Sequence, residues 1–272
     1  MLKQWKSHWP LYLMEAAGLG LFMLSASVFA AWLEFPESVL RQSLENGEVR
    51  RALMGAAMGL TAIAIIYSPL GKRSGAHINP AVTIAFWRLG KVGTADAVAY
   101  VLFQSLGGVA GVLLAQVLLG GWIADPHVNF VATVPAGARA MEAFLAEVLM
   151  SATLFFFILM VSNRPRLNRY TGLVAGLLVG SFIFLEAPLS GMSINPARSL
   201  ASALPSGIWT HFWIYLLAPP LGMLGAAVFY QWTMADSHPV LCARLHHINR
   251  FRCIFKCDFP KTGKSASTPS SM

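Results

Sequence analysis

Two short stretches of this sequence share one pattern and lie in similar surroundings. The first is SGAHINPAVTIAFWRLGK at residues 74–91, and the second is SGMSINPARSLASALPSG at residues 190–207. Both read Ser-Gly-x-x-Ile-Asn-Pro-Ala, and each continues into an apolar segment too short to cross a bilayer. One Asn-Pro-Ala alone would predict only a turn followed by a helix start. Two copies in apolar surroundings require an explanation that covers the whole chain.

The composition indicates a membrane protein. The chain has 272 residues, of which 56% are hydrophobic and 12% are charged, whereas soluble domains carry about 25% charged residues. Apolar runs near twenty residues predict six membrane-spanning helices, at 11–33, 49–68, 92–118, 141–161, 170–188 and 211–233. The first run is too long for a signal peptide and has no clear small-residue cleavage site, so we expect it to be retained.

The basic residues indicate the orientation of the chain. The formal net charge is +8, but Lys and Arg lie between the apolar runs and in the tail, so no nucleic-acid partner is expected. They gather before the first span, between the second and third spans, at 162–169 and after the last span. In loop 34–51, three arginines are partly balanced by four glutamates. The positive-inside rule predicts a multi-pass protein of the cell membrane with both termini in the cytoplasm.

The chain repeats itself. Asn79 and Asn195 lie 116 residues apart, and the stretches YLMEAAGLGLF around Glu15 and FLAEVLMSATL around Glu147 are offset by 132 residues. Three spans per repeat is an odd number, so the second copy must enter the membrane from the other side. This predicts an N-terminus, a first repeat, an outer loop, a second repeat and a basic cytoplasmic tail, at 1–10, 11–118, 119–140, 141–233 and 234–272.

The short segments at 79–88 and 195–204 are expected to be half-helices. Ten helical residues rise about 15 Å, which is half of a hydrocarbon core. Asn suits the helix N-cap and Pro the first helical position, so each helix would start at Asn-Pro-Ala near the midplane. Each helix N-terminus carries about half a positive charge, and two of them facing one pore would repel cations. A water held by both Asn amides could not relay a proton along a file.

The sequence resembles the aquaporin, or major intrinsic protein, family over about residues 8–233. The resemblance rests on HINPAVT at 77–83, SINPARS at 193–199, and the two glutamates Glu15 and Glu147. It implies an all-α membrane protein with six transmembrane helices, two re-entrant half-helices and an inverted 3+3 repeat. It also implies a homotetramer in contact with lipid, and a passive channel for water and small uncharged solutes. The implied pore motif is Asn79, Pro80, Ala81, Asn195, Pro196 and Ala197.

The resemblance also implies a selectivity filter around Arg198. A charge near the membrane interior is costly and is usually functional. Matching to the family places Met58, Ile183 and Met192 beside Arg198, with Gly59 replacing Met58 if no gap is allowed. This ring holds no histidine and no aromatic residue, so we expect passage of at least one solute less polar than water.

The pore also needs support for its re-entrant loops. A buried carboxylate requires hydrogen-bond donors, and the backbone N–H groups of the loops are suitable. We therefore expect Glu15, Glu147 and His77 to support the loops, and the two glutamates not to be catalytic acids.

Other positions leave the solute open. Glycerol facilitators resemble one another in an Asp after the arginine and a basic residue four positions later, where this chain has Ser199 and Ala203. Tyr215 matches the aromatic residue of water channels, but Leu216 replaces the expected Trp. The alternatives are a glycerol- or ammonia-type facilitator and, from another class, a membrane structural or adhesion protein with a residual pore. No acid/base or nucleophile–base set indicates an enzyme.

The tail contains every cysteine of the chain. A disulfide is not expected in the cytoplasm. One interpretation, which we prefer here, is a basic helix on anionic lipid. The other is a zinc site, which needs about four ligands, and zinc is the only cofactor considered. The residues concerned are Cys242, His246 or His247, Cys253 and Cys257 for zinc, and Arg244, Arg250, Arg252 and Lys256 for lipid. Residues 261–272 are expected to be disordered.

Overall fold

The computed structural model describes residues 2–247 and 250–259, and within them the regular structure is helical. Six of the helices in this part of the chain are long and apolar enough to cross a membrane. They are α1 (Leu2–Glu34), α3 (Gly47–Tyr67), α6 (Thr94–Leu119), α7 (Ala140–Ser162), α8 (Thr171–Ser190) and α10 (Phe212–Met234). The shorter helices are α2 (Val39–Ser43), α4 (Pro69–Ser74), α5 (Pro80–Arg88) and α9 (Pro196–Ser206). Single 3₁₀ turns lie at Gly120–Trp122, Asn129–Val131 and Asn168–Tyr170.

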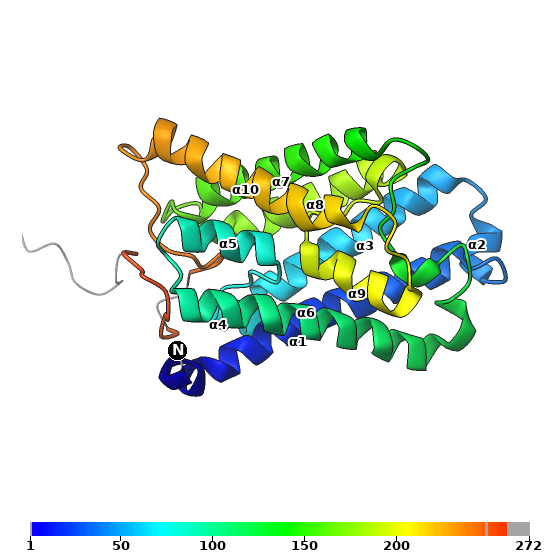
Figure 1. Cartoon of the computed structure of the whole chain (residues 1–272), viewed down its shortest axis with the longest axis horizontal. Coiled ribbons are helices and arrows are strands. Elements are labelled where there is room, and N and C mark those ends of the chain that lie inside the picture. Colours follow the sequence, from blue (N-terminus) through cyan, green and yellow to red (C-terminus); the bar gives the residue numbers. More distant parts are fainter. Residues whose placement is uncertain (1, 248–249, 260–272) are drawn as a thin grey trace, which may run out of the picture.

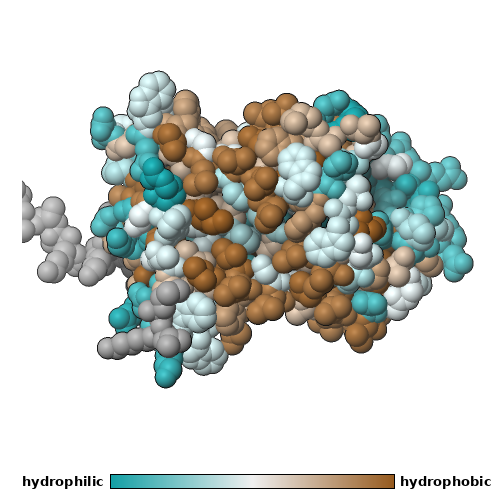
Figure 2. Space-filling view, in the orientation of Figure 1, coloured by the Kyte–Doolittle hydropathy of each residue, from teal (hydrophilic) through white to brown (hydrophobic). Residues whose placement is uncertain are grey.

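The long helices form a bundle around the two half-helices. Helices α5 and α9 lie one after the other in the middle of the bundle, between the α1–α6 pair and the α7–α10 pair (Figure 1). Hydrophobic side chains form a band around the middle of the visible face, and hydrophilic ones gather at both ends (Figure 2). We call the end that carries residue 2 and residues 235–259 the tail end, and the end that carries residues 120–139 the loop end. The band and the six helices confirm the expected membrane-spanning fold.

The helix contacts follow the repeat. Helix α1 packs on α6 in the first half as α7 packs on α10 in the second, and α3 packs on α8 between the halves. At this crossing, a Cβ added to Gly55 would lie 2.5 Å from the carbonyl oxygen of Gly180, and one added to Gly59 would lie 2.6 Å from that of Gly176. Small residues let membrane helices approach this closely. At Gly55 and Gly59, the contact between the two halves therefore admits no larger side chain.

Helix α1 begins at Leu2, earlier than the expected start of the first span at residue 11. The indole Nε1 of Trp5 donates to the carbonyl of Ala95 at 2.9 Å, and Nδ1 of His8 lies 2.8 Å from a carboxylate oxygen of Asp96. These polar contacts hold the first turns against the start of α6. Hydropathy alone does not detect such turns, because their residues are polar and aromatic rather than aliphatic.

The tail corrects one expectation. In its described parts, no helix follows Met234, so the interpretation as a basic helix on the lipid surface is wrong. Arg244, one of the residues assigned to that surface, is 1% exposed and donates hydrogen bonds to the carbonyls of Arg73, Phe251 and Arg252. The tail instead folds onto the protein itself. The expected disorder of residues 261–272 concerns residues outside the described part of the chain.

Candidate pore

Two re-entrant loops bring the half-helices to the centre of the bundle. Each loop leaves the preceding helix through a Ser-Gly pair and carries left-handed backbone conformations at equivalent positions. The φ values are 108° at Gly75, 57° at Ala76, 40° at Ile78, 76° at Gly191, 47° at Met192 and 50° at Ile194. Left-handed backbone is costly for residues other than glycine and persists only where the surroundings hold it in place. The repeated pattern therefore indicates that both loops are held in one functional shape.

Glu15 on α1 holds the first loop. Its buried carboxylate accepts hydrogen bonds from Ser74 Oγ at 2.6 Å, from the backbone N–H of His77 at 3.1 Å and from that of Ile78 at 2.5 Å. Gln104 on α6 donates a further bond from Nε2 at 2.9 Å. Charge-assisted hydrogen bonds of this kind are the strong ones in a low-dielectric interior. Glu15 thus supplies hydrogen-bond acceptors for the backbone N–H groups of His77 and Ile78.

Glu147 on α7 holds the second loop in the same way. It accepts hydrogen bonds from Ser190 Oγ at 2.8 Å, from Ser193 N at 2.7 Å and from Ile194 N at 2.6 Å. A trans peptide group points its carbonyl opposite to its N–H. The carbonyls of Met192 and Ser193 therefore point away from Glu147, and both residues line the cavity.

The two asparagines cap the half-helices, as expected from Asn-Pro-Ala. Oδ1 of Asn79 accepts from the backbone N–H of Ala81 at 2.9 Å, and Oδ1 of Asn195 accepts from those of Ala197 at 3.1 Å and Arg198 at 3.2 Å. Pro80 and Pro196 occupy the first helical turn, where a missing N–H costs nothing. The prediction of two helix starts at these positions is confirmed.

The amide nitrogens of the asparagines tie the two halves together. Nδ2 of Asn79 donates to the carbonyl of Ile194 at 2.7 Å, and Nδ2 of Asn195 donates to the carbonyl of Ile78 at 2.8 Å. An amide nitrogen has two donor hydrogens. One hydrogen of each asparagine is thus used across the halves, and one is left for the pore.

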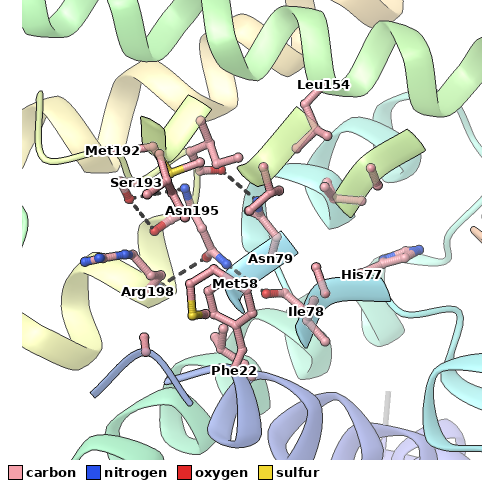
Figure 3. A pocket seen from close by; sticks show the side chains of 18 of the residues that line it. Phe22, Met58, His77, Ile78, Asn79, Leu154, Met192, Ser193, Asn195 and Arg198 are labelled. Atoms are coloured by element: carbon pink, nitrogen blue, oxygen red, sulfur yellow. Dashed lines mark hydrogen bonds between the residues drawn. The ribbon is translucent and has the colours of Figure 1, made fainter. Parts of the chain in front are cut away.

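A single cavity of about 250 Å³ passes the asparagines. Asn79, Asn195, Arg198 and Met58 lie around it, with Met192 and Ile78 on its sides (Figure 3). Met58, Ile183, Met192 and Arg198, the four predicted filter residues, all line this cavity. Gly59 lies instead in the contact between α3 and α8, so the geometry favours Met58 for the filter position. His77 also lines the cavity, and its Nδ1 lies 3.1 Å from Thr83 Oγ1.

The ends of the cavity involve residues that sequence reasoning missed. At the loop end, Nη1 of Arg198 donates to the carbonyl of Val131 at 2.8 Å, and Val131 lines the cavity. At the tail end, Leu245 lines the cavity although it lies far from both repeats in the sequence. Neither residue belongs to a motif. No pattern in the sequence could have identified them, because their positions depend on how two irregular segments fold back.

The tail brings its thiols together. Sγ of Cys242 lies 3.6 Å from Sγ of Cys253, and Sγ of Cys257 lies 3.6 Å from Nδ1 of His247. The ligand atoms of Cys242, His247 and Cys257 lie within 4.8 Å of one another. His246, which we first named as the histidine of a zinc site, packs its ring edge against Tyr67 instead. His247 and not His246 is the residue beside the thiols.

The thiols differ in acidity because of this contact. The hydrogen bond from Cys242 to Cys253 raises the pKa of Cys242 well above its ordinary value and lowers that of Cys253 to about 6. Burial raises the pKa of Cys257. Burial also lowers the pKa of His246, and the nearby charge of Lys72 acts in the same direction. The contact therefore makes Cys253 the most acidic of the three thiols.

Six membrane-spanning helices around one mostly apolar cavity, with two asparagines and an arginine on its wall, are typical of a membrane channel. The chain belongs to the major intrinsic protein family, whose model matches residues 2–230. Members of this family are channels and not enzymes, and they need no cofactor.

Several plant proteins are similar to this chain. The chain is 34% identical to Aquaporin NIP1-1 of Zea mays over 200 residues, which cover 72% of this chain and 68% of that protein. It is 37% identical to Aquaporin NIP1-1 of Arabidopsis thaliana over 189 residues, covering 67% and 62% of the two chains. It is 38% identical to Nodulin-26 of Glycine max over 186 residues, covering 67% and 65%.

A solved structure shares the fold. The aquaglyceroporin from Plasmodium falciparum superposes with a TM-score of 0.68 at 21% identity, over 83% of this chain and 96% of that one. The two proteins therefore share one fold.

Proposed function

We propose that this channel conducts water and a small, uncharged, weakly polar solute, and that it excludes protons and other cations. The observation that carries the proposal is the meeting of two capped half-helix N-termini beside one cavity, at Asn79 and Asn195. Each N-terminus presents about half a positive charge. Arg198 adds a full charge on the same path. A cation would meet this potential in a narrow, largely dehydrated passage.

Water passes by exchanging partners along the path. The free N–H groups of Asn79 and Asn195 donate to its oxygen, and the loop carbonyls accept its hydrogens. A water oriented by both asparagines points its hydrogens away from the centre. It then has no acceptor site left for a proton arriving from a neighbouring water, so the proton relay is interrupted at this point.

The filter determines the choice of solute. Met58, Ile183 and Met192 give three apolar walls, and Arg198 supplies the polar contact. A filter with few hydrogen-bonding groups offers little compensation to a molecule that gives up several water contacts. A solute with a small apolar surface and one or two hydrogen-bonding groups fits this ring better. This favours a glycerol- or ammonia-type solute alongside water. An adhesion role would have no use for two asparagines and an arginine around one cavity.

The chain is a multi-pass membrane protein, and we place its tail end in the cytoplasm. Lys72, Arg73, Arg88 and Lys91 lie on segments of the tail end, and basic residues are retained on the cytoplasmic side. The arginine-bearing loop 34–51 fits this orientation, because Arg50 is 7% exposed and pairs with Glu34 at 3.2 Å. The membrane would be the cell membrane, and the assembly a homotetramer with one pore in each subunit.

Stopped-flow measurements on proteoliposomes test the proposal. Vesicles with and without the protein are challenged in turn with gradients of sucrose, glycerol, urea and ammonium. We expect faster water flux, and faster flux of at least one of glycerol, urea and the neutral ammonia in equilibrium with ammonium, than in empty vesicles, with no added proton conductance. Water and solute fluxes equal to those of empty vesicles would contradict a channel role, and proton conductance would contradict the exclusion mechanism.

A further inference from the structure

We propose that the tail binds a zinc ion through Cys242, His247 and Cys257, with Cys253 as the fourth ligand. The bound ion would fasten the tail across the cytoplasmic mouth of the pore. The second statement rests on the proposed function of the channel, whereas the first does not.

Three of the four proposed ligands, Cys242, His247 and Cys257, already have their ligand atoms within 4.8 Å of one another, and Cys253 contacts Cys242. In a tetrahedral site, zinc lies about 2.0–2.3 Å from nitrogen and sulfur ligands, so the ligands lie about 3.3–3.8 Å from one another. The two contacts at 3.6 Å, between Cys242 and Cys253 and between Cys257 and His247, match this edge length. Three thiolates and one histidine form a common structural ligand set for zinc. None of the four residues lines the pore cavity, so the pore does not explain why they lie together.

The surroundings of the cluster suit a bound metal. Zinc with three thiolates carries one net negative charge, and the thiol protons still present are released to solvent on binding. Arg244 is buried beside the cluster, where its Nη2 donates to the carbonyl of Arg252. Its positive charge balances the site. The reducing cytoplasm also favours thiolate ligands over a disulfide between Cys242 and Cys253.

The zinc ligands lie on both arms of the folded tail. Cys242 and His247 lie on the first arm, 241–247, and Cys253 and Cys257 lie on the second, 250–258. Among the described residues, the arms are joined by a backbone hydrogen bond from Asp258 N to the carbonyl of Leu241 at 2.9 Å and by hydrogen bonds from Arg244 to the carbonyls of Phe251 and Arg252. An ion that cross-links the arms would add to these few bonds and so stabilise this fold. Small metal-bound segments commonly depend on the metal for their structure.

The first arm lies over the pore. Leu245 is 3% exposed, lines the pore cavity and donates its N–H to the carbonyl of Gly75 at 3.1 Å. Nε2 of His77 donates to the carbonyl of Ala243 at 2.8 Å, and the ring of Phe255 stacks on that of His77. Residues of the first re-entrant loop are thus the surface on which the tail rests. A zinc-bound tail keeps Leu245 in the path, and release of zinc frees the tail to move away.

Zinc content of the full-length protein tests the site. The protein is purified in detergent without chelator, supplied with equimolar zinc, passed over a desalting column and measured by elemental analysis. We expect about one zinc per chain in the wild type and a small fraction of that in the Cys253→Ser/Cys257→Ser double variant. Wild-type protein without zinc would overturn the site. Loss of two free thiols without zinc, measured by thiol labelling after denaturation, would assign the cluster to a disulfide instead.

Adjacent histidines provide a matched control. His247→Ala removes a ligand, whereas His246→Ala removes a ring that packs on Tyr67. We expect His247→Ala to lower the zinc affinity strongly and His246→Ala to leave the stoichiometry unchanged. Equal zinc affinity in the two variants would contradict the assignment of His247 as a ligand. The comparison is informative because a general effect on folding would lower the zinc affinity of both variants alike.

Transport measurements test the effect on the pore. In proteoliposomes, we expect a zinc chelator to raise water permeability several-fold in the wild type and to have no effect on the Cys253→Ser/Cys257→Ser variant. Leu245→Ala should raise permeability without chelator while it retains zinc, because it shortens the side chain in the path. If the protein binds zinc but its water flux does not change on chelation, the zinc-bound tail does not close the pore. Zinc binding in a protein that never conducts would refute the proposed function and leave the metal site standing.

Discussion

The loops at 74–79 and 190–195 hold their glutamates in the same way but are covered by different segments. The first is covered by the tail, where Phe255 approaches Gly75 and Leu245 donates to it. The second is covered by the connection between the repeats, where the backbone of Thr133 and Val134 lies close to Gly191. Each cover also contributes to the cavity lining, with Leu245 in one case and Val131 and Ala132 in the other. The covers belong to neither repeat.

This difference separates two tasks of the channel. The repeated parts form the centre of the pore, where two equivalent half-helices must be symmetrical to act on one water. The segments outside the repeat form the mouths, where the two sides of a membrane require different properties. We therefore expect substitutions in the repeated network to affect the whole fold, and substitutions in the covers to affect one mouth.

The largest effect is expected at the glutamates. Glu147→Gln replaces an oxygen that accepts from backbone N–H groups by an amide that donates, so at least one buried N–H loses its partner. Such a loss from a buried, charged network costs about 3 kcal/mol. At Glu15→Gln the cost should be smaller, because Gln104, whose Oε1 has no partner, can turn to accept from the new amide. Thermal unfolding in detergent compares them, and equal melting temperatures for both variants and the wild type would refute the support role.

The next largest effect is expected at Arg198, a charged residue of the pore whose equivalent in the first repeat is uncharged. Val82 is the first-half equivalent of Arg198, and both line the cavity. Arg198→Val makes the two half-helices alike at this position and removes the full positive charge. We expect higher glycerol flux and measurable proton leak, with little change in stability, from stopped-flow and pH-dye assays on the same vesicles. Unchanged solute and proton flux would show that Arg198 does not act as a filter.

A smaller effect is expected at the filter wall on α8. Ile183→His adds a hydrogen-bonding group opposite Arg198 and should lower the barrier for water relative to glycerol. A differential change of about 1 kcal/mol would alter the flux ratio about fivefold. The ratio of water to glycerol permeability in one vesicle preparation measures this shift independently of protein yield. An unchanged ratio would mean that Ile183 lies outside the rate-limiting constriction.

The smallest effect is expected at the outer cover. Thr133 Oγ1 lies 2.7 Å from Ser199 Oγ, which also contacts Ser193 at 2.6 Å. Thr133→Val removes one buried hydrogen bond, which costs about 1 kcal/mol and lowers the melting temperature by about 2–4 °C. Zinc content and the effect of chelation should not change, because the cluster lies at the other mouth. A change in zinc content would show that the two covers are coupled through the pore.

The sequence allowed the centre of the molecule to be predicted better than its mouths. The half-helices were predictable because Asn and Pro have specific roles at a helix start. The membrane spans were predictable because the length of an apolar run can be compared with the thickness of the hydrocarbon core. The support by Glu15 and Glu147 followed from the need of a buried carboxylate for donors. The mouths were not predictable in this way. The tail is held by backbone amides donating to Asn163 and Asn168, and such contacts leave no periodic trace. The choice between His246 and His247 depends on the direction of two adjacent side chains, which is set by the tertiary structure.

The hydrogen bonds around the re-entrant loops also define an order of assembly. Among the described residues, the donors to Glu15 belong to the first half and the donors to Glu147 to the second. A ribosome that has delivered only the first half has therefore delivered a loop that can close on its own glutamate. The two asparagine bonds, from Asn79 to Ile194 and from Asn195 to Ile78, form only after the second half arrives. We therefore expect the pore to be completed when the second half docks on the first, with α9 packing on α6 and α5 on α10. A chain cut within residues 119–140 should yield fragments that reassemble when made in the same cell.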